Sequence, residues 1–163
     1  MFVDKNAVLA GLANTPKILA AFIADIDERR RQLLRGPGCW TIDRHLDHLA
    51  RVQPMLLERL QRFAAEESPS FVPFVPPADG RPVEGECLPA DEAIAAFTDG
   101  RRRQLELLFG VDESYWTRHG SHPEYDRYST VILVRHMLAH DYWHMYRMEE
   151  LWLTKDAFLT RLD

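Results

Sequence analysis

The sequence predicts an all-α fold built on four long helices. Four segments repeat apolar residues every three or four positions, which is typical of amphipathic helices. No segment alternates convincingly like a strand, and the short stretch FVPFV is interrupted by Pro73. The chain has 163 residues, a length typical of one domain. We therefore expect a single domain spanning residues 1–163.

The first helix is expected from Thr15 onward. Thr15 can cap a helix, Pro16 suits the first helical position, and the Gly-Pro-Gly sequence at residues 36–38 would end it. Residues 4–13 are expected to form a short helical lead-in before the proline. The inward face is predicted to carry four apolar residues, Ile18, Phe22, Ile26 and Leu33.

The second helix is expected over residues 41–67, with Thr41 as its cap. Pro54 lies inside this segment and is expected to bend the helix, because proline removes one backbone hydrogen bond. Six residues step by three and four and should face inward: Leu46, Leu49, Gln53, Leu56, Leu60 and Phe63.

The third and fourth helices are expected over residues 91–109 and 129–154. The inward residues of the third are predicted to be Ile94, Phe97, Leu105 and Leu108. Two similar arginine-rich strings, at residues 27–34 and 99–108, are interpreted as solvated helix faces rather than a phosphate site.

The connection between the second and third helices, residues 68–89, is predicted to cross the bundle. It holds six of the ten prolines and has no helical period. Extended proline-rich chain rises about 3.1 Å per residue, so a segment of this length reaches roughly 65 Å, whereas a helix of about 24 residues spans about 36 Å. The second and third helices therefore need not be antiparallel neighbours.

Composition excludes several classes of function. The net charge of −5 at pH 7 disfavours a nucleic-acid partner. The N-terminus lacks a signal-peptide pattern, and the longest purely apolar run, Ile18–Ala24, is too short to span a membrane. Cys39 and Cys87 provide neither a disulfide framework nor a cysteine-based zinc site. We expect a cytoplasmic protein with free thiols and no membrane or nucleic-acid partner.

Three of the seven histidines stand four residues apart in RHMLAHDYWHMYRMEEL: His136, His140 and His144. Residues at i and i+4 share one helical face about 6 Å apart, so two such imidazoles can bind one metal at about 2.0–2.1 Å. His136 and His144 are about 12 Å apart along the helix axis, so one site uses only one adjacent pair. The third ligand would come from the second helix.

The second helix offers His45 or His48 as that third ligand. Val52 and Met55 flank His48 in helical register, which indicates that it points toward the bundle. Spacing alone chooses neither between these two histidines nor between the two pairs on the fourth helix. The pattern predicts a metal site that joins the second and fourth helices.

Two other metal sites are disfavoured. In the zinc-protease motif H-E-x-x-H, Asp141 would stand where a glutamate base is required, and only Glu149 and Glu150 follow as carboxylate ligands. A ferritin-like di-iron site needs two Glu-x-x-His motifs. The fourth helix offers only Asp141 followed by His144.

Two stretches resemble the DinB/YfiT-like family, the DinB superfamily. CWTIDRHLDHLARVQ resembles the second-helix signature, with matches at Trp40, Thr41, His48 and Leu49. Residues 119–151 resemble the closing segment, in which a His-Pro pair leads into a helix bearing His-acidic-x-x-His. The matching residues there are His122, Pro123, His140, Asp141 and His144. Arg147 departs from the pattern, since many relatives carry glutamine at this position.

This resemblance implies a four-helix bundle in up-down-down-up order and a homodimer. It also implies a divalent metal, zinc or nickel, held by His48, His140 and His144. His45 and His136 would then be neighbours of the ligands.

The resemblance further implies a thiol-dependent S-transferase or isomerase that uses a low-molecular-weight thiol such as bacillithiol or mycothiol. We expect a metal-dependent thiol S-transferase or hydrolase that acts on a small-molecule thiol or another small substrate. Three neutral histidines leave a coordination position open, as in catalytic zinc sites. The alternative is a non-catalytic, metal-stabilised, stress-associated binding or dimeric bundle protein. Its metal would be closed by a fourth ligand from the proline-rich connection or residues 121–128. A third interpretation leaves the imidazoles without metal, as hydrogen-bonding groups of the core.

Overall fold

The computed structural model describes residues 4–36, 39–73 and 87–160. It is mostly helical, which confirms the predicted fold class. The α-helices are α1 (Lys5–Ala24), α2 (Glu28–Arg31), α3 (Ile42–Arg51), α4 (Gln53–Ala65), α5 (Ala90–Gly110) and α6 (Thr130–Leu153). Two 3₁₀ helices, η1 (Glu113–Thr117) and η2 (Asp156–Phe158), and two strands, β1 (His119–His122) and β2 (Tyr125–Ser129), complete the elements.

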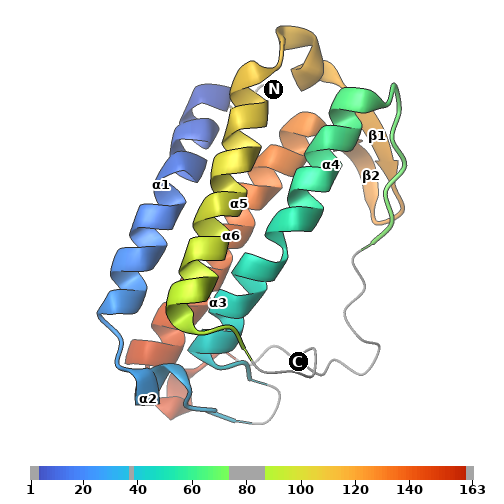
Figure 1. The fold of residues 1–163 in the computed structure, drawn as a ribbon. Helices are drawn as coiled ribbons and strands as arrows, with labels where there is room; N and C mark the ends of the chain where they lie inside the picture. Colours follow the sequence, from blue (N-terminus) through green and yellow to red (C-terminus); the bar gives the residue numbers. More distant parts are fainter. Residues whose placement is uncertain (1–3, 37–38, 74–86, 161–163) are drawn as a thin grey trace.

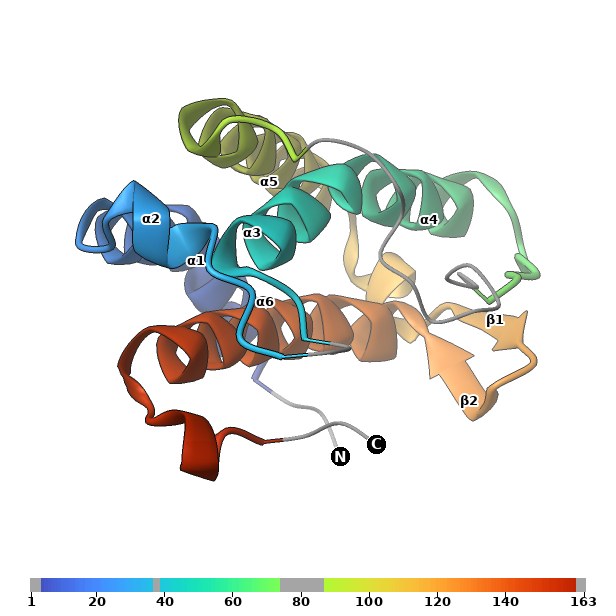
Figure 2. The same cartoon turned by 90° about the horizontal axis from the view of Figure 1, so that it is seen from below.

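The helices form a bundle in up-down-down-up order (Figure 1). In that view α1 descends, α3 and α4 ascend in succession, α5 also ascends, and α6 descends. Figure 2 shows α3 between α5 and α6, and α1 also packs against both of these helices. The end of α4 and the start of α5 lie at opposite ends of the bundle (Figure 1). Residues 74–86 of the predicted crossover lie outside the described residues.

The first helix begins earlier than the sequence suggested. It starts at Lys5, where the Asp4 carboxylate caps it by accepting from the backbone N–H of Asn6 at 3.0 Å. Pro16 therefore lies inside α1, where its missing N–H would have bonded to the carbonyl of Leu12. The Thr15 hydroxyl donates to that carbonyl at 3.0 Å instead. This bond gives the Leu12 carbonyl a partner in place of the one that the proline cannot supply.

The inward face of α1 also differs from the prediction. Ile18 and Leu33 are 44% and 46% exposed, whereas Ile26 is buried as expected. The regular helix ends at Ala24, so its period does not extend to Leu33. The buried residues of α1 are Val8, Leu9, Leu12, Thr15, Leu19 and Ile23.

The predicted second helix is divided into α3 and α4 at Val52, which confirms the bend near Pro54. The proline lies in the first turn of α4, where a missing N–H leaves no helical bond unmade. Thr41 caps α3 by accepting from the backbone N–H of Arg44 at 3.1 Å. All six residues expected to face inward are buried: Leu46, Leu49, Gln53, Leu56, Leu60 and Phe63.

A short antiparallel hairpin, which the sequence did not predict, precedes α6. Its pairs are His119 with Ser129, Gly120 with Tyr128, and His122 with Tyr125. The strands are four and five residues long and largely polar, so they carry no clear alternation. The hairpin buries Tyr128 and His122 against the end of the bundle that holds α4.

The core consists of two hydrophobic clusters with polar residues between them. On α1, Leu12 belongs to one cluster and Leu19 to the other; on α6, Met137 and Met145 are divided in the same way. Between the clusters lie five buried polar side chains, which we call the polar layer: Thr15, Gln53, Arg101, Gln104 and Asp141. Each of the four long segments of the bundle, with α3 and α4 counted as one, therefore carries at least one buried polar group at mid-height.

Gly100 allows α5 to approach this layer closely. A Cβ atom at Gly100 would lie 2.4 Å from the Cβ atom of Gln53, far inside van der Waals contact. Glycine inside a helix costs about 1 kcal/mol relative to alanine. Here it lets the backbone of α5 pack directly on the junction of α3 and α4.

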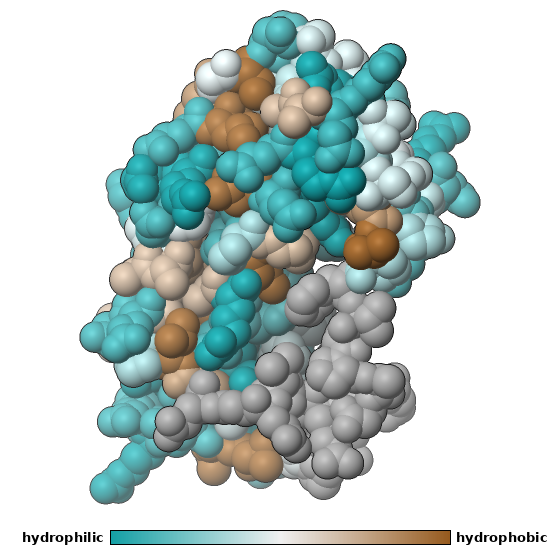
Figure 3. Space-filling model, turned by 45° about the vertical axis from the view of Figure 1, so that its right-hand side comes forward, coloured by the Kyte–Doolittle hydropathy of each residue, from teal (hydrophilic) through white to brown (hydrophobic). Residues whose placement is uncertain are grey.

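The surface in Figure 3 is mostly hydrophilic, with separate hydrophobic patches. By length and composition alone, α1 could cross a membrane, since its most apolar window has a mean hydropathy of 1.6. In the fold its buried side chains contribute to both core clusters, as the core helix of a bundle does. Of that window, 33% is buried in the fold, so packing accounts for part of its apolar composition.

Candidate metal centre

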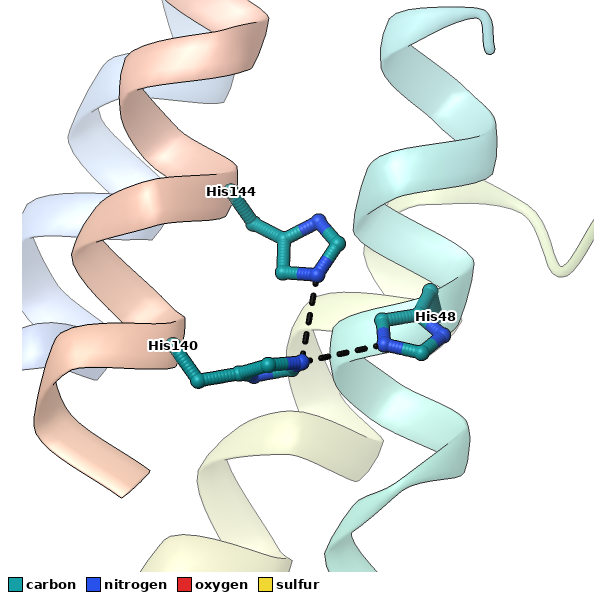
Figure 4. Close-up of side chains that lie close together, drawn as sticks. All are labelled: His48, His140 and His144. Carbon is teal, nitrogen blue, oxygen red and sulfur yellow. Dashed lines mark hydrogen bonds between the residues drawn. The ribbon is translucent and has the colours of Figure 1, made fainter. Parts of the chain in front are cut away.

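Three imidazoles from two helices converge beside the polar layer (Figure 4). The Nε2 atom of His140 lies 3.1 Å from Nε2 of His48 and 3.2 Å from Nε2 of His144. One ligand nitrogen from each ring lies within 4.8 Å of the others. In the described part of the chain, no other group of His, Cys, Asp or Glu converges in this way. The structure thus brings together the three predicted ligands and selects the His140 and His144 pair.

The spacing of these nitrogens fits a small divalent metal. Ligands bound tetrahedrally at about 2.0–2.1 Å are separated by roughly 3.3–3.4 Å, a few tenths of an ångström more than the two contacts made by His140. Without a metal, Nε2 of His140 has one proton or one lone pair to share between two partners. The sharing at Nε2 leaves a metal-free network poorly satisfied, whereas three Nε2 lone pairs suit a metal. The buried Nδ1 atom of His140 has no hydrogen-bond partner in the structure, with or without a metal.

The environment keeps these ligands neutral. Burial, followed by the neighbouring histidines, lowers the pKa of His140 to about 3. The same causes lower the pKa of His144. Burial also lowers the pKa of His48, and the weaker effect of Asp47 opposes it. Since only neutral imidazole binds a metal, the site is prepared for ligation at neutral pH.

His45 lies behind the triad rather than in it. Its Nδ1 atom is 2.8 Å from Nδ1 of His144, and the residue is only 4% exposed. If Nε2 of His144 faces a metal, its Nδ1–H donates to His45. Burial, followed by the positive charge of Arg147, lowers the pKa of His45 to about 3, so His45 is a neutral acceptor. The contact orients the His144 ring as outer partners of metal ligands do.

The other aromatic residues of the motif frame the site. The Trp40 ring centroid lies 5.1 Å from that of His45 and 5.3 Å from that of His48, so the indole covers the imidazoles. His136 is exposed, with its ring centroid 6.2 Å from His140, and it does not join the triad. Arg147, the departure from the family pattern, pairs with Glu150 and donates to the carbonyl of Thr160 at 3.1 Å.

Asp141 cannot act as the base of a zinc-protease motif, because it forms a buried ion pair. Arg101 donates to its carboxylate at 2.6 Å, and their side chains are 1% and 0% exposed. Arg101 also donates to Gln104 at 2.8 Å, and Gln104 donates to the carbonyl of Gln53 at 3.1 Å. The carboxylate is thus engaged inside the bundle.

The interpretation of the second arginine string as a solvated face was therefore wrong at Arg101. The spacing of the apolar residues in α5 could have shown that Arg101 faces inward. Arg101 follows Phe97 by four positions, and Gln104 precedes Leu108 by four, so both fall on the inward stripe. A charged residue in phase with the core indicates a buried partner.

A cavity of about 230 Å³ adjoins the triad. His48 and His140 form one end of its lining, and Val52, Leu56 and Met137 contribute apolar walls. Neither cysteine lines it. Cys39 and Cys87 are unpaired, and burial raises the pKa of the Cys87 thiol, so this thiol is not activated as a nucleophile.

Comparison with known proteins places the chain in a family and shows a structure of similar fold. Residues 12–154 match the family model described as the DinB superfamily. Comparison with curated proteins gives no significant match. A similar solved structure is that of YfiT from Bacillus subtilis, described as "a probable metal-dependent hydrolase with an unusual four-helix bundle topology". The two share 16% identity with a TM-score of 0.76, over 93% of this chain and 88% of that one, so the likeness is one of fold.

Proposed function

The chain belongs to the DinB superfamily, and we propose that it is a divalent-metal-dependent enzyme whose metal is held by His48, His140 and His144. The observation that carries this proposal is the convergence of three neutral imidazole nitrogens, from two helices, at one end of a cavity. Zinc and nickel suit this nitrogen donor set. Such a site would act on a molecule small enough to enter the cavity.

An open coordination position favours a catalytic metal over a metal that only stabilises the packing of the helices. Catalytic zinc sites use three protein ligands and keep one position free, whereas structural sites are closed by a fourth. Among the residues described, no fourth His, Cys, Asp or Glu joins the triad. His122 and Asp126 of the hairpin, candidates for a closing ligand, are not members of the group. Residues 74–86, the other predicted source, lie outside the described residues.

The reaction we propose is hydrolysis or thiol transfer on a small substrate. A divalent metal would supply Lewis acidity toward a substrate oxygen or sulfur. The chain itself would orient the ligands through the contact between His45 and His144, and cover them with Trp40. The apolar walls at Val52 and Met137 would limit water around a bound molecule. A small-molecule thiol is part of the proposal as co-substrate for the transfer reaction.

The test is metal analysis of protein purified without a polyhistidine tag, followed by cobalt substitution. We expect stoichiometric metal and a visible spectrum that changes when thiol or azide is added. A bound metal whose spectrum no small molecule changes would favour the non-catalytic, metal-stabilised alternative. Protein that takes up no divalent metal would favour the metal-free interpretation. Turnover is then assayed with ester, amide and thiol-conjugation substrates.

We also propose a cytoplasmic homodimer without a membrane or nucleic-acid partner. The two unpaired cysteines suit a reducing compartment. The dimer rests on the family resemblance alone. Light scattering at micromolar protein should give twice the chain mass of 18.9 kDa, and a monomeric mass would remove this part of the proposal.

A further inference from the structure

Beyond the two ligand histidines, the cavity beside the triad is lined by two kinds of residue. Four are apolar: Val52, Met55, Leu56 and Met137. The others are polar or aromatic, and we call them the polar side: Arg59, His122, Glu124, Tyr125, Tyr128 and His136. Pockets for drug-sized ligands have volumes of about 300–1,000 Å³, so a cavity of 230 Å³ suits a smaller molecule. A ligand that fills it meets both kinds of residue.

Arg59 is the permanent cation of the polar side. It donates to the Tyr128 hydroxyl at 3.3 Å and to the carbonyl of Val72 at 2.9 Å, and it lies over the Phe71 ring. A guanidinium has five N–H donors, so these two bonds leave donors for a ligand. Within the described ranges, no carboxylate lies within ion-pair distance of Arg59. Arg62, one turn further along α4, is by contrast paired with Glu66 at 2.6 Å.

The electrostatic influence of Arg59 extends over the polar side. Burial, and then the charge of Arg59, lowers the pKa of His122, while Glu124 has a weaker opposing effect. Glu124 is the acidic residue of the lining, and it is exposed. Its backbone N–H lies 3.3 Å from Nδ1 of His122, so a neutral His122 carries its proton on Nε2 as a further donor. This side of the cavity therefore offers donors and positive charge.

A continuous row of rings joins the triad to Arg59. The ring centroids of His140 and His136 are 6.2 Å apart, and those of His136 and Tyr125 are 6.4 Å apart. The row continues from Tyr125 to His122 at 4.9 Å and from His122 to Tyr128 at 5.0 Å. Tyr128 accepts from Arg59. A ligand lying along this wall would extend from the triad toward Arg59.

Resting on the proposed function, we propose that the substrate is a small amphipathic carboxylate whose anionic end binds Arg59 and whose reacting end faces His48 and His140. Its aliphatic middle packs against Val52 and Leu56. The guanidinium offers a carboxylate charge-assisted hydrogen bonds in a site already partly desolvated. Arg59 is then a specificity determinant that acts at a distance from the reacting atoms.

The first test needs no metal. Calorimetry on the metal-free protein compares hexanoate with 1-hexanol, two probes of equal chain length that differ in charge. Hydrogen bonds to charged groups contribute about 1.5–3 kcal/mol, so we expect hexanoate to bind roughly tenfold or more tightly. Arg59→Gln should abolish this preference, and Arg59→Lys should retain part of it. Equal affinities for the two probes in the unsubstituted protein, or no binding of either, would overturn the proposal.

Arg62→Gln is the matched control, because Arg62 covers the same Phe71 ring at 4.9 Å but does not line the cavity. It should leave the preference for hexanoate unchanged. Circular dichroism establishes that each variant is folded. If Arg59→Gln does not fold, the two probes are compared on the unsubstituted protein and on Arg59→Lys. That comparison still tests the preference for hexanoate.

A second measurement separates this proposal from the proposed function. Mercaptohexanoate and mercaptohexanol are titrated into the cobalt protein. If both thiols change the spectrum with equal affinity and Arg59→Gln has no effect, the metal-dependent function stands and the carboxylate specificity fails. If neither changes the spectrum while hexanoate still binds through Arg59, the open metal site fails and the anion site stands.

Discussion

The guanidinium of Arg101 donates to the carboxylate of Asp141 at 2.6 Å, across the centre of the bundle and one residue away from His140. The two residues belong to α5 and α6, each of which packs against α1 and α3. Burial raises the pKa of Asp141 to about 6, although the charge of Arg101 acts to lower it. The ion pair therefore fixes the ligand-bearing helix against α5 at the height of the candidate metal centre.

Replacing Asp141 with asparagine should destabilise the fold strongly. Breaking a buried pair from one side costs about 3–5 kcal/mol, because an uncompensated charge stays in the core. Arg101→Met should cost less, since Asp141 can take up a proton while arginine cannot lose one. The double variant Arg101→Met/Asp141→Leu should cost less than the sum of Arg101→Met and Asp141→Leu measured alone. Urea unfolding of all the variants measures these free energies.

Arg102→Met is the control for this series. Arg102 is adjacent in sequence but exposed, and its pairs with Asp99 and Glu106 lie on the surface. Its replacement should change stability little, because surface ion pairs are screened by water and salt. Equal losses for Arg101→Met and Arg102→Met would contradict the importance of the buried pair.

Each ligand variant, His48→Ala, His140→Ala and His144→Ala, should lose most of the affinity for zinc. Each of these variants removes one of the three bonds between the protein and the metal. The loss of zinc affinity should therefore exceed the roughly 10–100-fold loss that is typical when a hydrogen-bond partner of a ligand is replaced. His136→Ala should leave affinity nearly unchanged, because the His136 side chain lies outside the triad. Competition with a zinc chelator measures all four. Retention of metal by His48→Ala together with its loss from His136→Ala would show that the ligand assignment is wrong.

His45→Ala should weaken zinc binding by about 10–100-fold, less than loss of a ligand, because His45 orients His144 through the contact between their Nδ1 atoms. His45→Gln keeps a side-chain acceptor and should recover part of the affinity. The cobalt spectrum adds a second readout, since a misoriented His144 ring alters coordination geometry. A loss in His45→Ala as complete as that in His48→Ala would make His45 a ligand.

The metal-free protein should become less stable as the pH falls below about 6.5. Histidine has an unperturbed pKa of about 6.5, so the unfolded chain takes up protons below that value. In the fold, burial lowers the pKa of His45 and His140 to about 3, so these rings stay unprotonated while the unfolded chain binds protons. Stability is therefore full above about pH 6.5 and declines toward about pH 3, by up to about 1.4 kcal/mol per pH unit for each such group.

The carboxyl group of Asp141 has the opposite effect on stability as the pH falls. Its pKa is raised to about 6, so between that pH and its ordinary value the folded chain binds the extra proton and gains stability. One carboxyl does not offset several histidines, so the net slope remains downward. Urea unfolding at about pH 7.5 and about pH 5.5, on the metal-free protein and on His45→Phe, measures the effect. A free energy that does not depend on pH in this range would contradict the neutral state of the buried rings.

Local features of the sequence determined much of the fold. The apolar period of residues 41–67, the cap at Thr41 and the bend at Pro54 depend on residues a few positions apart, and the structure has all three. The predicted inward face of the first helix, by contrast, was wrong at Ile18 and Leu33. The column of histidines on α6 is likewise a local pattern. The start of α1 was missed because Pro16 was expected to mark the start of the helix, whereas α1 begins at Lys5 and continues through Pro16.

Tertiary packing decided which of these residues meet. Sequence spacing allowed either His45 or His48 to be the third ligand. The packing of α3 on α6 brought Nε2 of His48 to His140, and it brought Nδ1 of His45 to His144. The partnership of Arg101 with Asp141 spans forty positions of sequence. Periodicity tells which face of a helix turns inward, because side-chain direction follows from helical geometry. It does not tell which residue of another helix lies opposite, because relative height and crossing angle are set by the packing of the whole bundle.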